Sequence, residues 1–172
     1  MLRKAVEFLL FVILFILQMT VFQFFKIASV SPNLLVILVA SFGFIKGKKE
    51  GLIVGFFCGV FMDLYFSNTL GVYALFYMLV GYLNGFFKNE FFPEDIKMPL
   101  ILIGFSDIIY NILIFLGLFL FRGRFNLGYY FLNIILPEVV YTVLISVILY
   151  PVILRINNWI EKYEKRSASK FG

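Results

Sequence analysis

Long apolar stretches constrain this chain more than any other feature of its sequence. Six of them follow one another, separated by short polar segments: 5–25, 33–45, 51–66, 70–87, 99–121 and 129–154. A helix that crosses a bilayer needs roughly 17–25 apolar residues. Four stretches reach that length, whereas 33–45 and 51–66 fall short of it. We therefore predict an all-α polytopic membrane protein, a six-transmembrane-helix bundle with short loops.

The composition supports this class. The 172 residues are 62% hydrophobic and only 15% charged, which is more apolar surface than a water-soluble domain of this size needs. It also excludes a disordered protein, a disulfide-stapled secreted module and a typical nucleic-acid binder. Because the six stretches leave no room for a soluble domain, we expect residues 1–172 to form a single integral membrane domain.

The two short stretches leave three arrangements open. Each could recruit flanking residues, lie in a thinner part of the membrane, or contribute to a re-entrant hairpin. At the N-terminus, Arg3 and Lys4 resemble the charged region of a signal peptide. The apolar stretch that follows is too long for a signal peptide and has no convincing cleavage site. We therefore expect an uncleaved first span.

The basic residues predict the topology. With six spans and a cytoplasmic N-terminus, the outer loops carry only Lys26, Arg122 and Arg124. The other 12 of the 15 basic residues fall inside: Arg3, Lys4, Lys46, Lys48, Lys49, Lys88, Lys97, Arg155, Lys162, Lys165, Arg166 and Lys170. Cytoplasmic segments of membrane proteins are enriched in Lys and Arg. The pattern favours a multi-pass membrane protein with both termini in the cytoplasm.

Residues that carry chemistry are conspicuously few. The chain has no histidine, which excludes Ser-His-Asp and Cys-His catalysis and histidine-ligated zinc or haem. Its single cysteine, Cys58, lies in an apolar stretch and is expected to pack as a small hydrophobic residue. No phosphate-binding loop or hydrolase motif is present. We predict a protein that is not an enzyme and that binds no metal or cofactor.

Glycines recur every fourth residue in the third stretch. Gly51, Gly55 and Gly59 are followed four residues later by Asp63, so all four share one helix face. Small residues let helices approach closely in lipid. This face is expected to pack either against another span of the chain or against a partner protein. Gly81 forms a similar pair with Gly85 in the next stretch.

Three acidic residues interrupt apolar stretches: Asp63, Asp107 and Glu138. Asn111 shares a helix face with Asp107, and Pro137 immediately precedes Glu138. No lysine or arginine lies in the middle of a span, so each acid must be neutral, hydrogen-bonded, or in contact with water or a partner. Three roles stay open: hydrogen bonds that fix helix packing, a proton or cation path, and a polar seat for a partner or ligand. For the first role, amide analogues should keep most of the hydrogen bonding.

Two further segments have a recognisable pattern. Ser31 and Pro32 are suited to the cap and the first turn of the second helix. The tail 155–172 places apolar residues at helical spacing, which predicts an amphipathic helix on the inner membrane surface. The alternative is a frayed, solvated end. The apolar positions of the tail are Ile156, Trp159, Ile160 and Tyr163.

Several of these positions together resemble a known family, the rod shape-determining protein MreD. The resemblance is best over residues 32–85, and the last span matches in its proline, Pro137. The residues that carry it are Pro32, Asn33, Leu34 and Leu35, then Gly51, Gly55, Gly59 and Asp63, then Leu70, Gly71, Val72, Tyr73, Ala74 and Leu75, and Gly81 with Tyr82.

The resemblance implies a non-enzymatic scaffold of the bacterial cell-wall elongation complex. Its partners would be an MreC-like single-span protein, MreB-like filaments, and the transglycosylase and transpeptidase of wall synthesis. The MreD bundle is also similar to the substrate-binding membrane subunit of energy-coupling-factor vitamin transporters, which supplies an alternative function. A vitamin-binding subunit should have an outer pocket lined by polar and aromatic side chains. A scaffold should have a lipid-facing groove for a partner helix.

Overall fold

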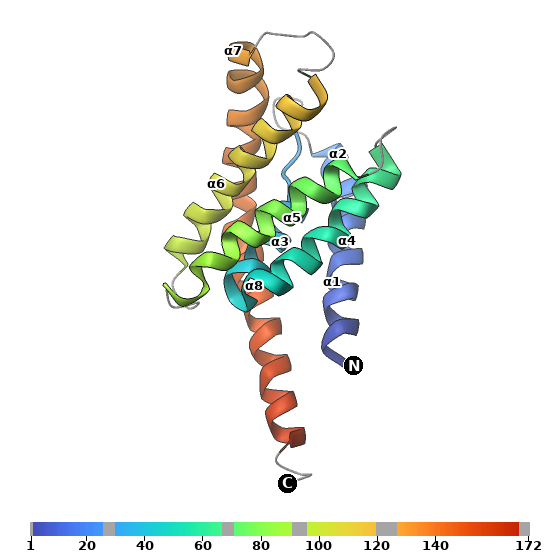
Figure 1. Cartoon of the computed structure of the whole chain (residues 1–172), viewed down its shortest axis with the longest axis vertical. Helices are drawn as coiled ribbons and strands as arrows, with labels where there is room; N and C mark the ends of the chain where they lie inside the picture. The colour runs from blue at the N-terminus through green and yellow to red at the C-terminus, as the bar shows by residue number, and fades with distance from the viewer. Residues whose placement is uncertain (1, 26–29, 67–70, 91–95, 120–126, 169–172) are drawn as a thin grey trace.

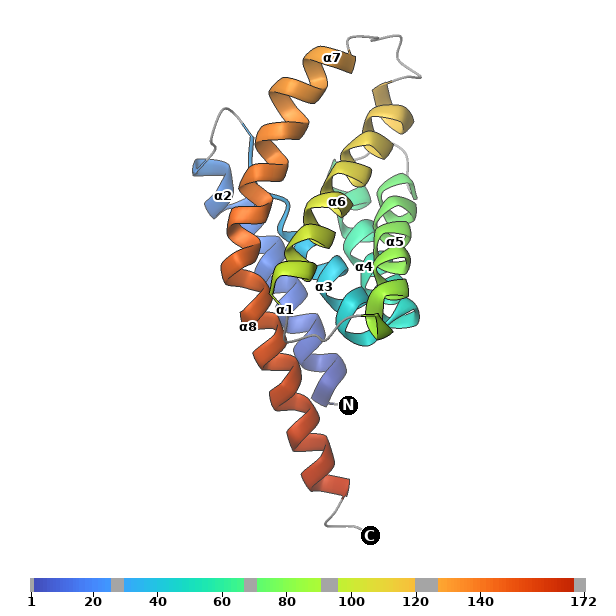
Figure 2. The ribbon, with the colours of Figure 1, turned by 90° about the vertical axis from the view of Figure 1, so that its left-hand side faces the viewer.

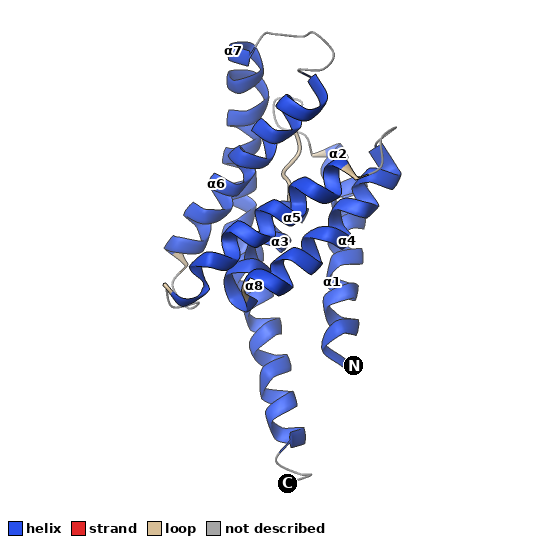
Figure 3. Cartoon of the chain, viewed as in Figure 1, coloured by secondary structure: helices blue, strands red, loops and turns tan. Residues whose placement is uncertain are grey.

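The computed structural model describes residues 2–25, 30–66, 71–90, 96–119 and 127–168, and this part of the chain is almost entirely helical (Figures 1 and 3). The prediction of an all-α fold is confirmed. The α-helices are α1 (Leu2–Met19), α2 (Val21–Phe24), α3 (Leu34–Lys46), α4 (Lys48–Phe66), α5 (Val72–Asn84), α6 (Lys97–Ile114), α7 (Leu127–Tyr130) and α8 (Leu136–Ala168). A 3₁₀ turn, η1 (Gly85–Asn89), and two π-helical turns, η2 (Phe115–Phe119) and η4 (Phe131–Ile135), extend three of them.

The helices run up and down between two ends of the molecule. The start of α1 and the last turns of α8 lie at one end, and η2 and α7 lie at the other (Figures 1 and 2). We call these the terminal end and the far end. The start of α1 and the last described turns of α8 therefore lie on the same side of the bundle. The basic residues assigned to outer loops, Lys26, Arg122 and Arg124, lie outside the described residues.

Helix α3 forms the centre of the bundle. It contacts α1, α4, α5, α6 and α8, and every residue from Leu34 to Ile45 is buried. Its 13 residues span about 20 Å at 1.5 Å per residue, less than the hydrocarbon thickness of a bilayer. The cap of this helix differs from the prediction, because Asn33 rather than Ser31 accepts the hydrogen bond from the N–H of Val36. Pro32 precedes the cap and does not occupy the first turn.

Within the described residues, two helices are long and apolar enough to cross a membrane by length and composition: Lys97–Gly117 and Gly128–Arg166. Among the shorter helices, Leu34–Lys46 is also apolar. Helices α1 and α4 carry charged residues in their first turns, which lowers their apolar length. The structure thus confirms the helical architecture, while the crossing of the membrane by all six stretches stays a prediction.

Helix α8 is much longer than the membrane requires. Its 33 residues correspond to about 50 Å, against a hydrocarbon thickness of about 30 Å. The helix passes through Pro151 and continues to Ala168, and Figure 2 shows it projecting beyond the other helices. The structure has no break between the span and the tail, so the described part of the tail continues α8 and is not a separate surface helix. Within it, Ile160 is buried and Trp159 is exposed.

Candidate functional site

The glycine stripe of α4 packs directly on α5. A Cβ atom on Gly55 would collide with the backbone of Tyr77, and one on Gly59 would collide with the backbone of Ala74. Real side chains never approach a backbone so closely, so only glycine fits at either position. This face is therefore closed by the chain's own α5 and cannot receive a partner helix.

The same contact continues towards the terminal end. Gly51 and Gly81 lie opposite each other, and a Cβ on either would strike the backbone of the other. Gly85 in turn lies against the backbone of Lys48. Tyr82, which belongs to the same stretch of α5, points away from this contact, is 39% exposed and packs edge-on against Phe86. The α4–α5 pair is thus a tight helical hairpin.

Asp63 closes the other end of this hairpin. Its Oδ2 accepts hydrogen bonds from the N–H groups of Gly71 and Ala74, and its Oδ1 accepts one from Tyr73, each at 3.0 Å. Gly71 is the N-cap of α5 and has no side chain to cap the helix itself, with φ of 106°. A carboxylate from α4 therefore replaces the missing cap and complements the helix dipole.

Asn33 connects three helices at the centre of the bundle. Its Oδ1 accepts a hydrogen bond from the hydroxyl of Tyr77 at 3.1 Å, and its backbone N–H donates to Thr142 Oγ1 at 3.0 Å. Gln18 of α1 joins this region because its Oε1 accepts from the N–H of Leu35 at 3.1 Å. Buried side chains of α1, α3, α5 and α8 thus form a polar centre in an otherwise apolar bundle.

Two of the three predicted acids come together at this polar centre. Asp107 is fully buried, and its polar neighbours are Asn33, Thr142 and Glu138. Asn111 donates a hydrogen bond from Nδ2 to the backbone oxygen of Asp107 at 3.0 Å. Neither carboxyl oxygen of Asp107 has a hydrogen-bond partner of good geometry among the described residues. Asp63, in contrast, serves the α4–α5 hairpin and takes no part in this cluster.

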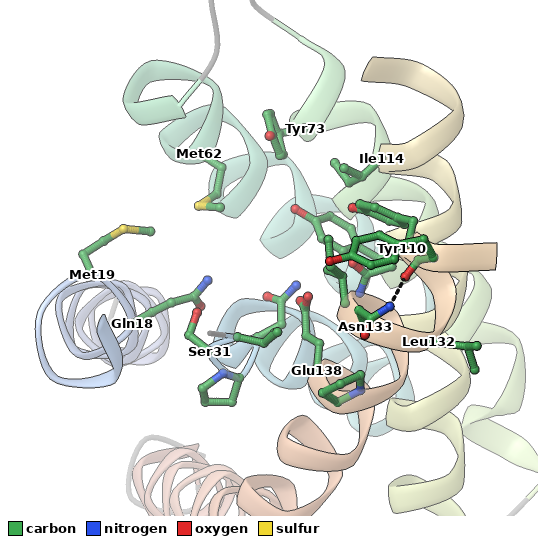
Figure 4. Close-up of a pocket in the computed structure, with 18 residues that line it drawn as sticks. Gln18, Met19, Ser31, Met62, Tyr73, Tyr110, Ile114, Leu132, Asn133 and Glu138 are labelled. Atoms are coloured by element: carbon green, nitrogen blue, oxygen red, sulfur yellow. Dashed lines mark hydrogen bonds between the residues drawn. The ribbon is translucent and has the colours of Figure 1, made fainter. Parts of the chain in front are cut away.

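A polar pocket of about 700 Å³ opens next to these acids. Glu138 reaches into it from α8, with Gln18 of α1 on one side and Tyr110 of α6 on the other (Figure 4). Pro32 and Pro137 belong to its wall. The amides that line it are Gln18, Asn33, Asn111 and Asn133, and the aromatic residues are Tyr73, Tyr110, Tyr129 and Tyr130.

The polar and aromatic residues of this pocket that the sequence pattern did not single out are Gln18, Tyr110, Tyr129, Tyr130 and Asn133. Gln18 gave a signal, since it is a polar residue inside an apolar stretch. The tyrosines gave none, because tyrosine is common in membrane spans and Tyr73, Tyr110 and the Tyr129–Tyr130 pair come from three separate segments of the chain. They line one pocket because α5 and α6 pack on each other and on α3, and Tyr130 of α7 packs against Phe115 of η2.

A second, smaller hollow lies between α1 and α4. It has a volume of about 230 Å³ and is lined mainly by Phe8 and Phe11 of α1 and by Ile53, Val54 and Phe57 of α4. We call it the α1/α4 groove.

The α1/α4 groove is bounded by one polar and one aromatic contact. The Lys4–Glu50 ion pair at 2.8 Å lies towards the terminal end, and the edge-on rings of Phe11 and Phe61 at 4.9 Å lie towards the far end. Between these contacts, side chains of both helices remain exposed, with Phe8 at 55% and Phe57 at 50%. The groove is thus open and apolar.

Ion pairs tie the terminal end together. Lys46 of α3 contacts Glu161 of α8 at 2.7 Å, and Arg3 of α1 contacts Glu164 at 3.5 Å. The hydrogen bond from Lys46 lowers the pKa of the Glu161 carboxyl, against a smaller opposing effect of burial. Lys46 is almost fully buried, so this pair holds the extended part of α8 against the end of α3.

The arrangement offers no recognisable catalytic constellation in the described residues. They contain no group of three or more acidic, cysteine or histidine side chains that could hold a metal ion. Cys58 is buried among apolar residues, which is the setting of a structural cysteine and not of a reactive one. What the described structure does offer is a polar pocket and apolar hollows on its surface: the α1/α4 groove, and one of about 270 Å³ between Leu52 of α4 and Leu75 to Tyr82 of α5.

Comparison with known proteins identifies the family. Residues 2–158 match the family of the rod shape-determining protein MreD. No curated protein and no solved structure matches the chain. The match covers nearly all of the helical bundle, and with the two apolar helices it indicates a membrane protein with a role in rod shape determination. It gives no support to the vitamin-transporter alternative. The chain belongs to the MreD family of rod shape-determining proteins.

Proposed function

We propose that this chain is a non-enzymatic scaffold of the cell-wall elongation complex that holds an MreC-like single-span protein in the inner membrane. The observation that carries the proposal is the open α1/α4 groove. The glycine face, which the sequence also suggested as a helix contact, is already filled by α5. The partner helix would thereby be placed near the MreB-like filaments and the transglycosylase and transpeptidase of the complex.

The size and lining of the α1/α4 groove suit the side chains of a partner helix. A volume of about 230 Å³ holds one or two large apolar side chains, not a whole helix. Phe8 and Phe57 on its rim would pack along the partner. In lipid, packing of this kind supplies most of the attraction between helices. The Lys4–Glu50 pair would contact polar residues at the end of the partner's span.

The proposed topology is six spans with both termini in the cytoplasm. The common position of the first residues of α1 and the last turns of α8 supports an even number of crossings (Figure 1). The 12 basic residues assigned to inner segments support the cytoplasmic side for that end. The short helix α3 avoids contact with lipid because the other helices surround it.

Cysteine cross-linking tests the position of the partner. Cys58 is buried, so introduced cysteines report on their own surroundings. Phe8→Cys and Phe57→Cys should form disulfides with a cysteine series along the partner's span, with a helical period. Phe105→Cys on α6, which is 61% exposed, is the matched control and should form none. Cross-links from Phe105→Cys, with none from Phe8→Cys or Phe57→Cys, would place the partner elsewhere.

A further inference from the structure

The polar pocket is the feature that the scaffold role leaves unused. Its volume of about 700 Å³ falls within the range of about 300–1,000 Å³ typical of small-molecule sites. Residues of α1, α4, α5, α6, α7 and α8 contribute to its wall together with Asn33 at the start of α3, so the pocket depends on the packing of nearly the whole bundle. It lies at the opposite end of the bundle from the charged Lys46–Glu161 contact. The charge of the lining residues limits the kinds of ligand that the pocket can bind.

Acidic side chains that have no basic neighbour among the described lining residues mark this pocket. Glu138 is the only charged side chain in the described wall, and the buried carboxyl of Asp107 lies directly behind it. No lysine or arginine lines the described part of the pocket. Removing a carboxylate from water without a cation is unfavourable, so the site suits a ligand that brings positive charge. The same charge disfavours phosphate or carboxylate ligands.

The aromatic residues indicate which kind of cation the pocket binds. Tyr73, Tyr110, Tyr129 and Tyr130 come from α5, α6 and α7 and line the same cavity. Aromatic rings around a carboxylate are the recurring way in which proteins bind organic ammonium groups, through cation–π attraction. The amide side chains of Asn33 and Asn111 lie within hydrogen-bonding reach of the Glu138 carboxyl and fix its position in the pocket. A hydrated metal ion would gain little from the rings.

We infer that this pocket binds an organic ammonium group, with Glu138 as its counterion and the tyrosines around it. The amine could be carried by a lipid headgroup that enters from the bilayer or by a free small molecule. Both present the same cation to the same residues. The inference concerns a different surface from the α1/α4 groove and does not depend on the partner protein.

A pair of isosteric probes tests the charge requirement. The full chain is placed in nanodiscs of phosphatidylglycerol, and the binding of choline is compared with that of 3,3-dimethylbutan-1-ol by calorimetry. The two molecules have the same shape and differ only in charge. Choline should bind saturably, and the neutral alcohol should bind at least about tenfold more weakly. Equal binding of the two would overturn the inference.

Variants locate the site. Glu138→Gln should weaken choline binding about tenfold, because the amide keeps the shape of the carboxylate and removes its charge. Tyr129→Leu should weaken it severalfold without loss of folding, since Tyr129 is 69% exposed. Glu161→Gln and Tyr163→Leu at the terminal end are the matched controls and should bind as the parent protein does. Undiminished binding in both pocket variants would overturn the assignment.

A lipid experiment separates the two sources of the amine. The protein is reconstituted in mixed phosphatidylethanolamine and phosphatidylglycerol, and retained lipids are identified by native mass spectrometry. Retention of phosphatidylethanolamine that Glu138→Gln abolishes would identify a lipid headgroup as the ligand. Choline binding without retained phosphatidylethanolamine would identify a soluble amine. If neither choline nor phosphatidylethanolamine binds the parent protein, the inference is wrong.

Discussion

The carboxylate of Asp63 on α4 accepts a hydrogen bond from the backbone N–H of Ala74 on α5 at 3.0 Å. It also accepts bonds from two further N–H groups of the same helix start, so both carboxylate oxygens are used. The acid thereby fixes the α4–α5 hairpin at one end, while the glycine stripe fixes it along its length. The first two predictions concern these two features.

We predict that Asp63→Asn destabilises the protein by about 1–3 kcal/mol. An amide has one acceptor oxygen and would turn its NH₂ group towards backbone N–H donors. This differs from the expectation drawn from the sequence, that an amide would preserve most of the hydrogen bonding. Thermal unfolding in detergent measures the effect. Glu50→Gln, near the other end of α4, is the control and should change stability by less than about 1 kcal/mol. Equal melting temperatures for Asp63→Asn and the parent would refute the capping role.

We predict that Gly59→Leu disrupts the bundle, because the added atoms would occupy the position of the Ala74 backbone. Overpacking of a tight contact costs at least about 1–3 kcal/mol. Gly128→Leu is the matched control, since nothing lies within 4 Å of a Cβ built at Gly128. The amount of protein in the membrane and the midpoint temperature of thermal unfolding should both be lower for Gly59→Leu, and both should be unchanged for Gly128→Leu. Normal abundance and unfolding of Gly59→Leu would show that α4 and α5 are not packed so closely.

The glycine stripe shows what the sequence could and could not predict. Its four-residue spacing indicated a tight helix contact, but spacing alone could not distinguish the chain's own α5 from a partner. Asp107 and Glu138 are far apart in sequence, and they meet only because both helices pack on α3. Such convergence depends on the relative positions of the helices, which no local pattern records. The all-α class, in contrast, follows from apolar length alone.

We predict that the Lys46–Glu161 pair loses its contribution to stability at acid pH. Because the pKa of Glu161 is lowered in the folded protein, the pair stabilises fully above the ordinary glutamate value of 4.5. The contribution disappears as the pH falls through the lowered pKa. The side chain of Glu161 is 42% exposed, so solvent screening limits the effect to below about 1 kcal/mol. Thermal unfolding between pH 6 and pH 3 measures it.

Glu161→Gln is the control for this pH dependence. The variant should be slightly less stable than the parent at pH 6, and the two should converge at pH 3. A difference between parent and variant that stayed constant over this range would exclude the ionised pair as its source.

We predict that the α3–α4 turn faces the cytoplasm. A cysteine at the exposed residue Lys49 should react with an impermeant maleimide only after the membrane is permeabilised. Tyr129→Cys, near the far end, should react in intact cells. Labelling of Lys49→Cys in intact cells would contradict the proposed topology.

The most direct test of the scaffold account is quantitative affinity purification from bacterial membranes. The parent chain and the control Phe105→Ala should each retain a single-span MreC-like protein in fixed stoichiometry, and depletion of the chain should make rod-shaped cells round. The double variant Phe8→Ala/Phe57→Ala removes two large side chains that line the α1/α4 groove. It should lose that partner while remaining folded in the membrane. Undiminished partner in the double variant, or a bound vitamin and an ATPase module with normal cell shape on depletion, would contradict the account.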